Sequence, residues 1–501
     1  MIMALIDEFA LKVDSALHAK DFAKLNEAIE DLKKVDLNTL KPIDQASVHY
    51  FMANAYSGLI STPITSTLVD SFQIYKEKEI FHLRFALNLL SNISLKNIGT
   101  DLKLRITTNL ANTLYSTGRF VEAIELWDKV LITSPGFSMA VANKALTLFN
   151  YARYAQTSHT QGLFLKESYE LFKLALELGV ESQAHNEMTS MVAHLQSLTD
   201  WEKVKIELPK YRKGRSKNEK KYRKWCIKNN LFLDLLNDIS QDWPALEDTL
   251  TLPNMTMEVN EGGPDLPAPY SIFNQLKQEY VSARFLMFEA IQEQDMPLHY
   301  SDRKVLLYDA LDYRYYRLWI EKLKMSFLAV FAIFDKIAYL INDYWKLSAN
   351  VKYLSFQTIW FEDSRKKSII RHQFITSDNK SLLGLFWLSK DLYFQKDSSE
   401  FINPEAKTLS DIRNHIAHKY LRVHDHHLYN PANERTAKGH DLSFPISNIE
   451  LVDQSLKLLK LVRSALIYIT NAMTYEESKR STNSNYTFPM EITSVEDQYR
   501  L

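Results

Sequence analysis

Apolar residues recur along most of the chain at the three- and four-residue spacing of amphipathic helices. The clearest case is the stretch 104–135, "LRITTNLANTLYSTGRFVEAIELWDKVLITSP". Its apolar positions form two groups, one on each side of Gly118: Leu110, Ala111 and Leu114, then Ala123, Trp127 and Val130. Glycine adopts turn conformations easily and proline ends a helix. The pattern therefore predicts two packed helices that are joined at Gly118 and end at Pro135.

This hairpin resembles the tetratricopeptide repeat, a pair of helices of about 34 residues that stacks into a superhelix. Small residues at Ala111 and Ala123 let the helices approach closely, and Trp127 fills the groove between hairpins; the family usually has glycine where this chain has Ala111. Looser copies of the pattern occur at 20–32, 46–59 and 168–179. The series predicts a solenoid of helical hairpins over residues 1–205, whose groove is expected to hold a protein or peptide partner. A generic helical bundle is the alternative.

The second half of the chain predicts a separate bundle. Residues 242–270 hold five prolines and a Gly-Gly pair without helical periodicity, so 206–270 are expected to form a basic segment and a linker. Five apolar-periodic segments follow and predict a helical bundle over 271–475, with a polar tail at 476–501. The most apolar run, 325–341, is broken after ten residues by Asp335 and Lys336. Because a bilayer needs about 20 apolar residues, we expect a buried helix in a water-soluble protein with no membrane partner.

Composition supports an all-α fold. Glycine is scarce, 11 of 501 residues, whereas average usage is roughly 7%, and long helices with short loops need few glycines. The 60 basic and 61 acidic side chains balance, so any nucleic-acid surface must be local. The single cysteine, Cys226, excludes an internal disulfide and fits a reducing cytosol. Acidic residues at Asp7 and Glu8 argue against a signal peptide, so a cytoplasmic protein is expected.

A candidate nucleic-acid-binding surface lies just after the predicted solenoid. Between residues 210 and 224 there are nine lysines or arginines and one acidic residue, Glu219, interleaved with Tyr211 and Tyr222. Cations bind phosphates and aromatic faces stack bases, so the mixture suits single-stranded RNA. The candidate RNA-binding residues are Lys210, Arg212, Lys213, Arg215, Lys220, Lys221, Arg223 and Lys224. The alternative is a solvated connector without a ligand.

The stretch 409–423, "LSDIRNHIAHKYLRV", concentrates polar chemistry in a segment with helical periodicity. At about 100° per residue, five residues fall on one apolar face: Leu409, Ile412, Ile416, Tyr420 and Val423. Asn414 and His418 stack one turn apart on the opposite side. Arg413 lies at the margin, with Asp411 and His415 nearby as supporting residues. The helix is therefore expected to bury one stripe and to present a guanidinium, a carboxamide and imidazoles.

These groups suit the cleavage of RNA, which carries its own nucleophile in the 2′-hydroxyl. Such an enzyme needs a proton acceptor and a proton donor, and histidine serves as either near neutral pH. It also needs a fixed cation for the charge that grows on the phosphate, which a planar guanidinium provides. Neither a metal ion nor a cofactor is required. Because one helix supplies one of each group, two such helices facing each other predict a homodimer with a composite site.

The motif "RNHIAH", from Arg413 to His418, resembles the arginine, four to six residues, histidine motif of the HEPN superfamily. The chain also resembles a bacterial branch of that superfamily in which helical repeats precede the bundle. HEPN domains are all-α bundles that commonly act as metal-independent endoribonucleases when dimeric, in toxin–antitoxin, abortive-infection and CRISPR-linked systems. The resemblance implies that Arg413 and His418 are catalytic and that Asn414 supports them. It also implies cleavage to 2′,3′-cyclic phosphate ends in bacterial stress or antiphage defence, regulated by the N-terminal repeats.

Other interpretations stay open. A non-catalytic scaffold would bind a protein or RNA through the repeats and use the bundle only to dimerise. The cluster "HDHH", 424–427, has metal-binding residue types, but adjacent ligands rarely converge on one ion, so no metal site is expected there. Asp335 and Lys336 are expected to form a buried polar pair that braces the helix of Arg413, with RNA contact as the alternative. The absence of a Gly-rich phosphate loop followed by lysine argues against nucleotidyl transfer.

Overall fold

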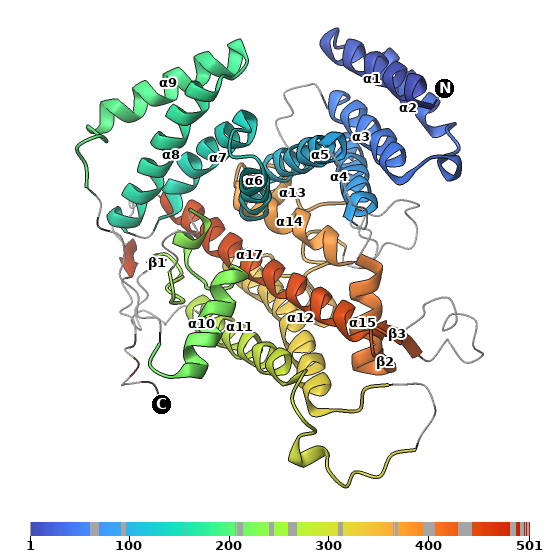
Figure 1. The fold of residues 1–501 in the computed structure, drawn as a ribbon. Helices are drawn as coiled ribbons and strands as arrows, with labels where there is room; N and C mark the ends of the chain where they lie inside the picture. Colours follow the sequence, from blue (N-terminus) through green and yellow to red (C-terminus); the bar gives the residue numbers. More distant parts are fainter. Residues whose placement is uncertain are drawn as a thin grey trace. The chain divides into compact units, whose positions relative to one another are not determined.

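The computed structural model of the chain is mostly helical, as the sequence predicts (Figure 1). It describes residues 2–60, 70–91, 97–155, 157–205, 207, 214–239, 245–258, 268–308, 314–363, 365, 369–393, 406–428, 443–480, 487–490, 495, 497 and 500. The chain divides into two compact units. Unit 1 comprises residues 1–207, 360–362 and 367–411, and unit 2 comprises residues 208–359, 363–366 and 412–501.

Unit 1 begins with helices that pack against their neighbours in the chain. They are α1 (Ile2–His18), α2 (Phe22–Lys33), α3 (Pro42–Gly58), α4 (Asp70–Ser91), α5 (Asn97–Ser116), α6 (Phe120–Thr133), α7 (Ser138–Tyr151), α8 (Ser158–Leu178) and α9 (Ser182–Leu198). The predicted hairpin at 104–135 is formed by α5 and α6, and Gly118 lies in the turn with φ +83°. Trp127 is fully buried, as its predicted place in the packing requires. The paired N-terminal helices are therefore confirmed.

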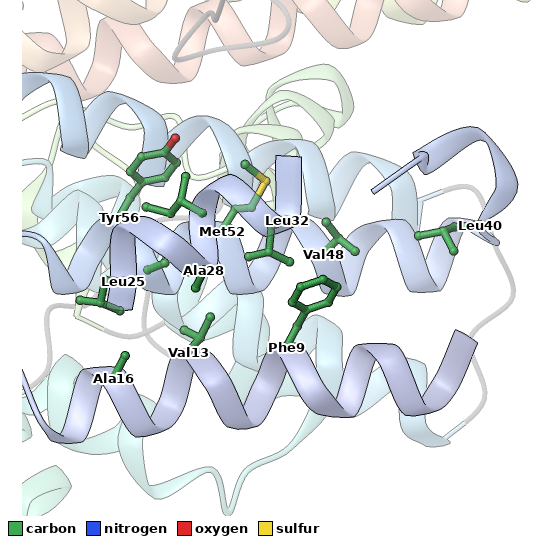
Figure 2. Close-up of a cluster of buried hydrophobic side chains, with 12 residues drawn as sticks. Phe9, Val13, Ala16, Leu25, Ala28, Leu32, Leu40, Val48, Met52 and Tyr56 are labelled. Carbon is green, nitrogen blue, oxygen red and sulfur yellow. The ribbon is translucent and has the colours of Figure 1, made fainter. Parts of the chain in front are cut away.

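The first three helices share one apolar core, which follows from their helical spacing. Figure 2 shows this core, to which α1, α2 and α3 each contribute residues three or four positions apart: Phe9, Val13 and Ala16, then Leu25, Ala28 and Leu32, then Val48, Met52 and Tyr56. Residues at this spacing lie on one face of a helix. Each helix therefore buries one stripe against the other two.

Two later helices, α13 (His372–Ile375) and α14 (Lys380–Leu392), also belong to unit 1. The backbones of α14 and the α5–α6 turn touch, because a Cβ built on Gly384 would lie 2.5 Å from the Gly118 carbonyl oxygen. Asp391 of α14 is buried and accepts hydrogen bonds from Arg84 of α4 and from Arg119. These contacts tie α14 to helices nearly three hundred residues earlier in the chain.

The core of unit 2 is formed by α11 (Ala268–Glu293), α12 (Leu318–Tyr344) and α17 (Asn448–Lys479), which lie side by side (Figure 1). α10 (Lys217–Lys228) packs on α11. By length and composition alone, α12 is apolar enough to cross a membrane, a property that it shares with core helices of soluble proteins. Here it packs against both α11 and α17. Its Asp335 accepts a hydrogen bond from the Phe356 backbone N–H at 3.0 Å, and Lys336 pairs with Glu279 of α11.

Two small sheets complete unit 2. β1 (Met255–Glu258) pairs antiparallel with β4 (Thr487–Met490), and β2 (Tyr420–His424) pairs parallel with β3 (Ser443–Ser447), so that Leu421 is in register with Phe444. Short 3-10 turns occur at Leu37–Thr39, Ala152–Tyr154, Leu235–Asp238, Tyr300–Asp302 and Val351–Tyr353. A buried Arg463 of α17 binds Asp238 at 2.8 Å and the Phe232 carbonyl at 2.8 Å, and so fixes the segment that follows α10 on the bundle.

The stretch 409–423 is not helical throughout. Helix α15 (Ala406–His418) ends at His418, and the next residues form β2. The prediction that Tyr420 and Val423 continue one helical face is wrong for that reason: Val423 is buried within a sheet, and Tyr420 is 41% exposed. The segment Tyr-Leu-Arg-Val has a propensity for β-strand. It forms a strand here because it pairs with β3, which is too far along the chain to be seen in the local sequence pattern.

Candidate active site on helix α15

Helix α15 carries Arg413, Asn414 and His418, the three residues that the sequence predicts to be catalytic. Leu409 and Ile412 are buried, at 2% and 0% exposure, and hold the helix against the protein. Arg413 and Asn414 are half-buried, and His418 is exposed at the last residue of the helix. The helix thus buries Leu409 and Ile412, leaves the third predicted apolar residue, Ile416, half-buried, and exposes His418 at its C-terminal end.

Arg413 is oriented by two neighbours in unit 2. Its Nη1 donates a hydrogen bond to Asn414 Oδ1 at 3.1 Å. Its guanidinium lies 5.5 Å from the centroid of the Phe331 ring of α12, a cation–π contact. Among the residues that the structure describes, no carboxylate pairs with Arg413. The described residues therefore use only one of the hydrogen-bond donors of this guanidinium.

His418 lies five residues after Arg413. This spacing corresponds to about 7.5 Å along the helix axis and to about 140° around it. Asn414, four residues before His418, lies on nearly the same face. The imidazole forms no hydrogen bond within the described part of the chain and faces solvent. In a single copy, then, Arg413 and His418 point in different directions from one helix.

The two supporting candidates lie on the same helix. Asp411 and His415 are both half-buried. The His415 ring is 5.6 Å from the ring of Phe444 on β3, so this histidine packs against the small sheet. Of the two histidines on α15, His418 is therefore the exposed one.

Sequence reasoning missed a cluster beside α15 that comes from the segment before α12. Arg314 forms an antiparallel bridge with His424, and the Tyr315 backbone N–H donates to the Val423 carbonyl at 2.9 Å. Tyr316 and Tyr420 share a hydrogen bond between their hydroxyls at 3.1 Å, which raises the pKa of Tyr316. The only local signal for this cluster is the aromatic and basic run "YRYYR" at 313–317.

The predicted RNA-binding segment is described in part. Lys210, Arg212 and Lys213 lie outside the described residues. Arg223 is half-buried, and it binds Glu219 at 3.1 Å and the Leu246 carbonyl at 3.1 Å. The exposed cations of the segment are Arg215, Lys217, Lys220, Lys221, Lys224 and Lys228.

The exposed lysines of α10 follow helical spacing. Lys217, Lys221, Lys224 and Lys228 are separated by four, three and four residues, which places them on one face. The opposite face is anchored, because the Tyr222 hydroxyl accepts a hydrogen bond from Arg284 of α11 at 2.8 Å. The result is a fixed row of cations, termed the lysine row from here on.

The histidine cluster at 424–427 does not assemble a metal site within the described residues. His424 is buried at 3% exposure, whereas His426 and His427 are exposed. No group of three or more histidine, cysteine, aspartate or glutamate side chains is placed to hold a metal ion in the parts of the chain described above.

A helical bundle that carries an arginine and a histidine five residues apart on a late helix has the arrangement of an HEPN domain. Residues 260–476 match the LA2681-like HEPN family. This part of the chain is therefore an LA2681-like HEPN domain, and HEPN domains form a family of ribonucleases. No family match identifies the N-terminal helices as tetratricopeptide repeats. No curated protein and no solved structure matches the chain.

Proposed function

We propose that the protein is a metal-independent endoribonuclease whose active site is built from Arg413, Asn414 and His418. The observation that supports the proposal is the arrangement of side chains in the C-terminal half of α15, which lies in a domain of a ribonuclease family. There, a guanidinium without a carboxylate partner among the described residues is held by Asn414 and Phe331, and an exposed imidazole follows it. These are the groups that transesterification of RNA requires.

In the proposed reaction, the 2′-oxygen of a ribose attacks the adjacent phosphorus. One histidine accepts the 2′-hydroxyl proton, and a second proton reaches the 5′-oxygen as the bond to phosphorus breaks. Arg413 stabilises the charge on the non-bridging oxygens. The products are a 2′,3′-cyclic phosphate and a free 5′-hydroxyl. Because one copy holds one exposed histidine on α15, the second His418 comes from a second copy, and the unit is a homodimer through the HEPN bundle.

The decisive experiment compares His418→Ala and Arg413→Ala with the wild type on RNA in the presence of EDTA. We expect the wild type to leave 2′,3′-cyclic ends without added metal. Loss of one general acid–base group should lower the rate by about 10² to 10⁴-fold. His427→Ala, which removes an exposed histidine outside α15, is the matched control and should keep full activity. If His418→Ala cleaves RNA as fast as the wild type, the assignment is wrong.

The lysine row gives the proposed enzyme a surface for the RNA backbone. The four lysines lie on one face of a twelve-residue helix, and the first and last are about 16 Å apart along its axis. Each phosphate contact contributes to the salt dependence of binding. Replacing Lys217, Lys221, Lys224 and Lys228 with glutamine should weaken RNA binding and reduce its salt dependence, while the chemistry at His418 is unchanged.

The N-terminal helices are proposed to regulate this activity as a repeat-like binding surface, in a cytoplasmic protein of bacterial stress or antiphage defence. A specific observation also supports the alternative of a non-catalytic scaffold. Half-buried asparagines link neighbouring first helices of the pairs: Asn109 donates to Asn54 at 3.0 Å, and Asn143 donates to Asn112 at 2.8 Å. If Arg413→Ala leaves protection against phage intact while Asn143→Ala abolishes it, the scaffold is the better description.

A further inference from the structure

Two exposed tyrosines lie beside the end of α15. Tyr420 is two residues after His418 and is 41% exposed, and Tyr316 is 46% exposed. Their hydroxyls are 3.1 Å apart. Arg314 donates from Nη1 to the Tyr420 hydroxyl at 2.7 Å, and its guanidinium lies 5.6 Å from the centroid of the Tyr420 ring. Arg314, Tyr316 and Tyr420 are termed the tyrosine platform below.

The platform is held in place by backbone as well as by side chains. The segment of Arg314 and Tyr315 runs antiparallel to β2 through the Arg314–His424 bridge and the bond from the Tyr315 N–H to the Val423 carbonyl. Within β2, only Tyr420 is exposed, and the four residues after it are buried. The two rings are therefore fixed at the surface, so little conformational entropy is lost when a ligand stacks on them.

Exposed aromatic rings and guanidinium planes are the surfaces on which proteins stack unpaired nucleobases. Two residues of chain span at most about 7.6 Å between α-carbons. A base on Tyr420 therefore brings its own ribose and phosphate toward His418. We propose that the tyrosine platform stacks an unpaired base next to the cleaved phosphodiester and makes this site selective for single-stranded RNA. Paired bases in a duplex are already stacked on one another and do not present a free face.

This selectivity rests on the proposed ribonuclease function, but binding can be measured without cleavage. The probe is a short single-stranded RNA that is methylated on every 2′-oxygen and is therefore not cleavable; the same strand annealed to its complement is the second probe. The variants are Tyr316→Ala, Tyr420→Ala and both together, each compared with the Phe substitutions that keep the ring. Tyr339→Ala, on α12 and 38% exposed, is the matched control. Thermal unfolding checks that every variant is folded, and Tyr316→Ala leaves β2 itself intact.

Loss of one stacked base should weaken binding of the single strand by about 5- to 150-fold in the alanine variants. The phenylalanine variants and Tyr339→Ala should bind as the wild type does, and duplex affinity should be unchanged. The proposal is wrong if the double alanine variant binds the single strand as tightly as the wild type does. It is also wrong if the alanine variants lose as much affinity for the duplex as for the single strand. If the wild type binds the probe through the tyrosines but cleaves no RNA, the ribonuclease proposal fails alone. If it cleaves RNA while the alanine variants bind normally, the platform fails alone.

Discussion

Replacing Asp391 with alanine should loosen α14 from the N-terminal helices of unit 1. The Asp391 side chain is 1% exposed and accepts hydrogen bonds from Arg84 on both carboxylate oxygens, at 2.6 and 2.8 Å. Arg119, whose side chain is 2% exposed, donates to the same carboxylate. Burial alone would raise the pKa of Asp391, but the charges and hydrogen bonds of the two arginines hold it below its ordinary value. The carboxylate is therefore buried and ionised, and two arginines balance its negative charge.

Removing one partner from a buried ion pair costs about 3–5 kcal/mol, because the remaining charge is left without compensation. Arg119 keeps a second partner, Glu122, at 2.8 Å. We therefore expect the lower end of this range, about 3 kcal/mol of local stability in α14. At 1.36 kcal/mol per factor of ten, the amides of α14 should exchange with solvent about 150-fold faster.

Native-state hydrogen exchange followed on peptides from α14 measures this change directly. The matched control is Asp101→Ala, which removes an i,i+4 ion pair with Arg105 whose side chains are 55% and 59% exposed. Exposed pairs contribute little, so this variant should exchange as the wild type does in α14. Exchange of α14 in Asp391→Ala within a factor of ten of the wild type would refute the reasoning that the buried carboxylate holds this helix.

Three further outcomes are expected. Burial lowers the pKa of His49 to about 4 and that of His82 to about 3, so the unfolded chain binds more protons below pH 6.5. Stability in urea should therefore fall by about 2 kcal/mol per histidine between pH 6.5 and 5, and a His49→Gln, His82→Gln variant should lose this dependence. Gly384→Ala should destabilise by about 1–3 kcal/mol, because its Cβ meets the Gly118 carbonyl, whereas Gly136→Ala, with its nearest atom at 3.8 Å, should unfold at nearly the wild-type midpoint. Ribonuclease activity per subunit should fall on dilution below the dimer dissociation constant measured by light scattering; constant activity there contradicts a composite site.

Local periodicity was sufficient to predict those elements whose partners are close in the chain. The α5–α6 hairpin follows from apolar spacing around Gly118, and both helices bury the predicted residues. The exposed His418 and the buried Ile412 follow from the same rule applied to α15. In each case, the information lies within about two helical turns, which is the range over which side-chain spacing fixes a face.

Local sequence spacing does not predict the elements that depend on partners far away in the chain. Asp391 in an apolar helix has no sequence signal for its two arginines, which lie 307 and 272 residues away. The end of α15 was missed because β2 depends on pairing with β3 and with the segment of Arg314, both of which are separated from it along the chain. The orientation of Arg413 depends in the same way on Phe331, a residue of another helix. Sequence spacing thus locates the catalytic candidates, and tertiary contacts decide how they point.

The geometry of α15 also bears on how the proposed activity would be controlled. Groups that act on one phosphate must lie within hydrogen-bond reach of it. In one copy, however, Arg413 and His418 are about 140° apart around the helix and about 7.5 Å apart along it. Under the proposed mechanism, a single chain would supply the cation, which Asn414 orients, but would not supply both the acid and the base. Activity would then depend on association, and any ligand of the N-terminal helices that favours or opposes the dimer would act by mass action. The His418→Ala variant should lose cleavage but still form the dimer. Dilution of the wild type should separate the dimer while every chain keeps His418. The two experiments therefore test the catalytic group and the dimer separately.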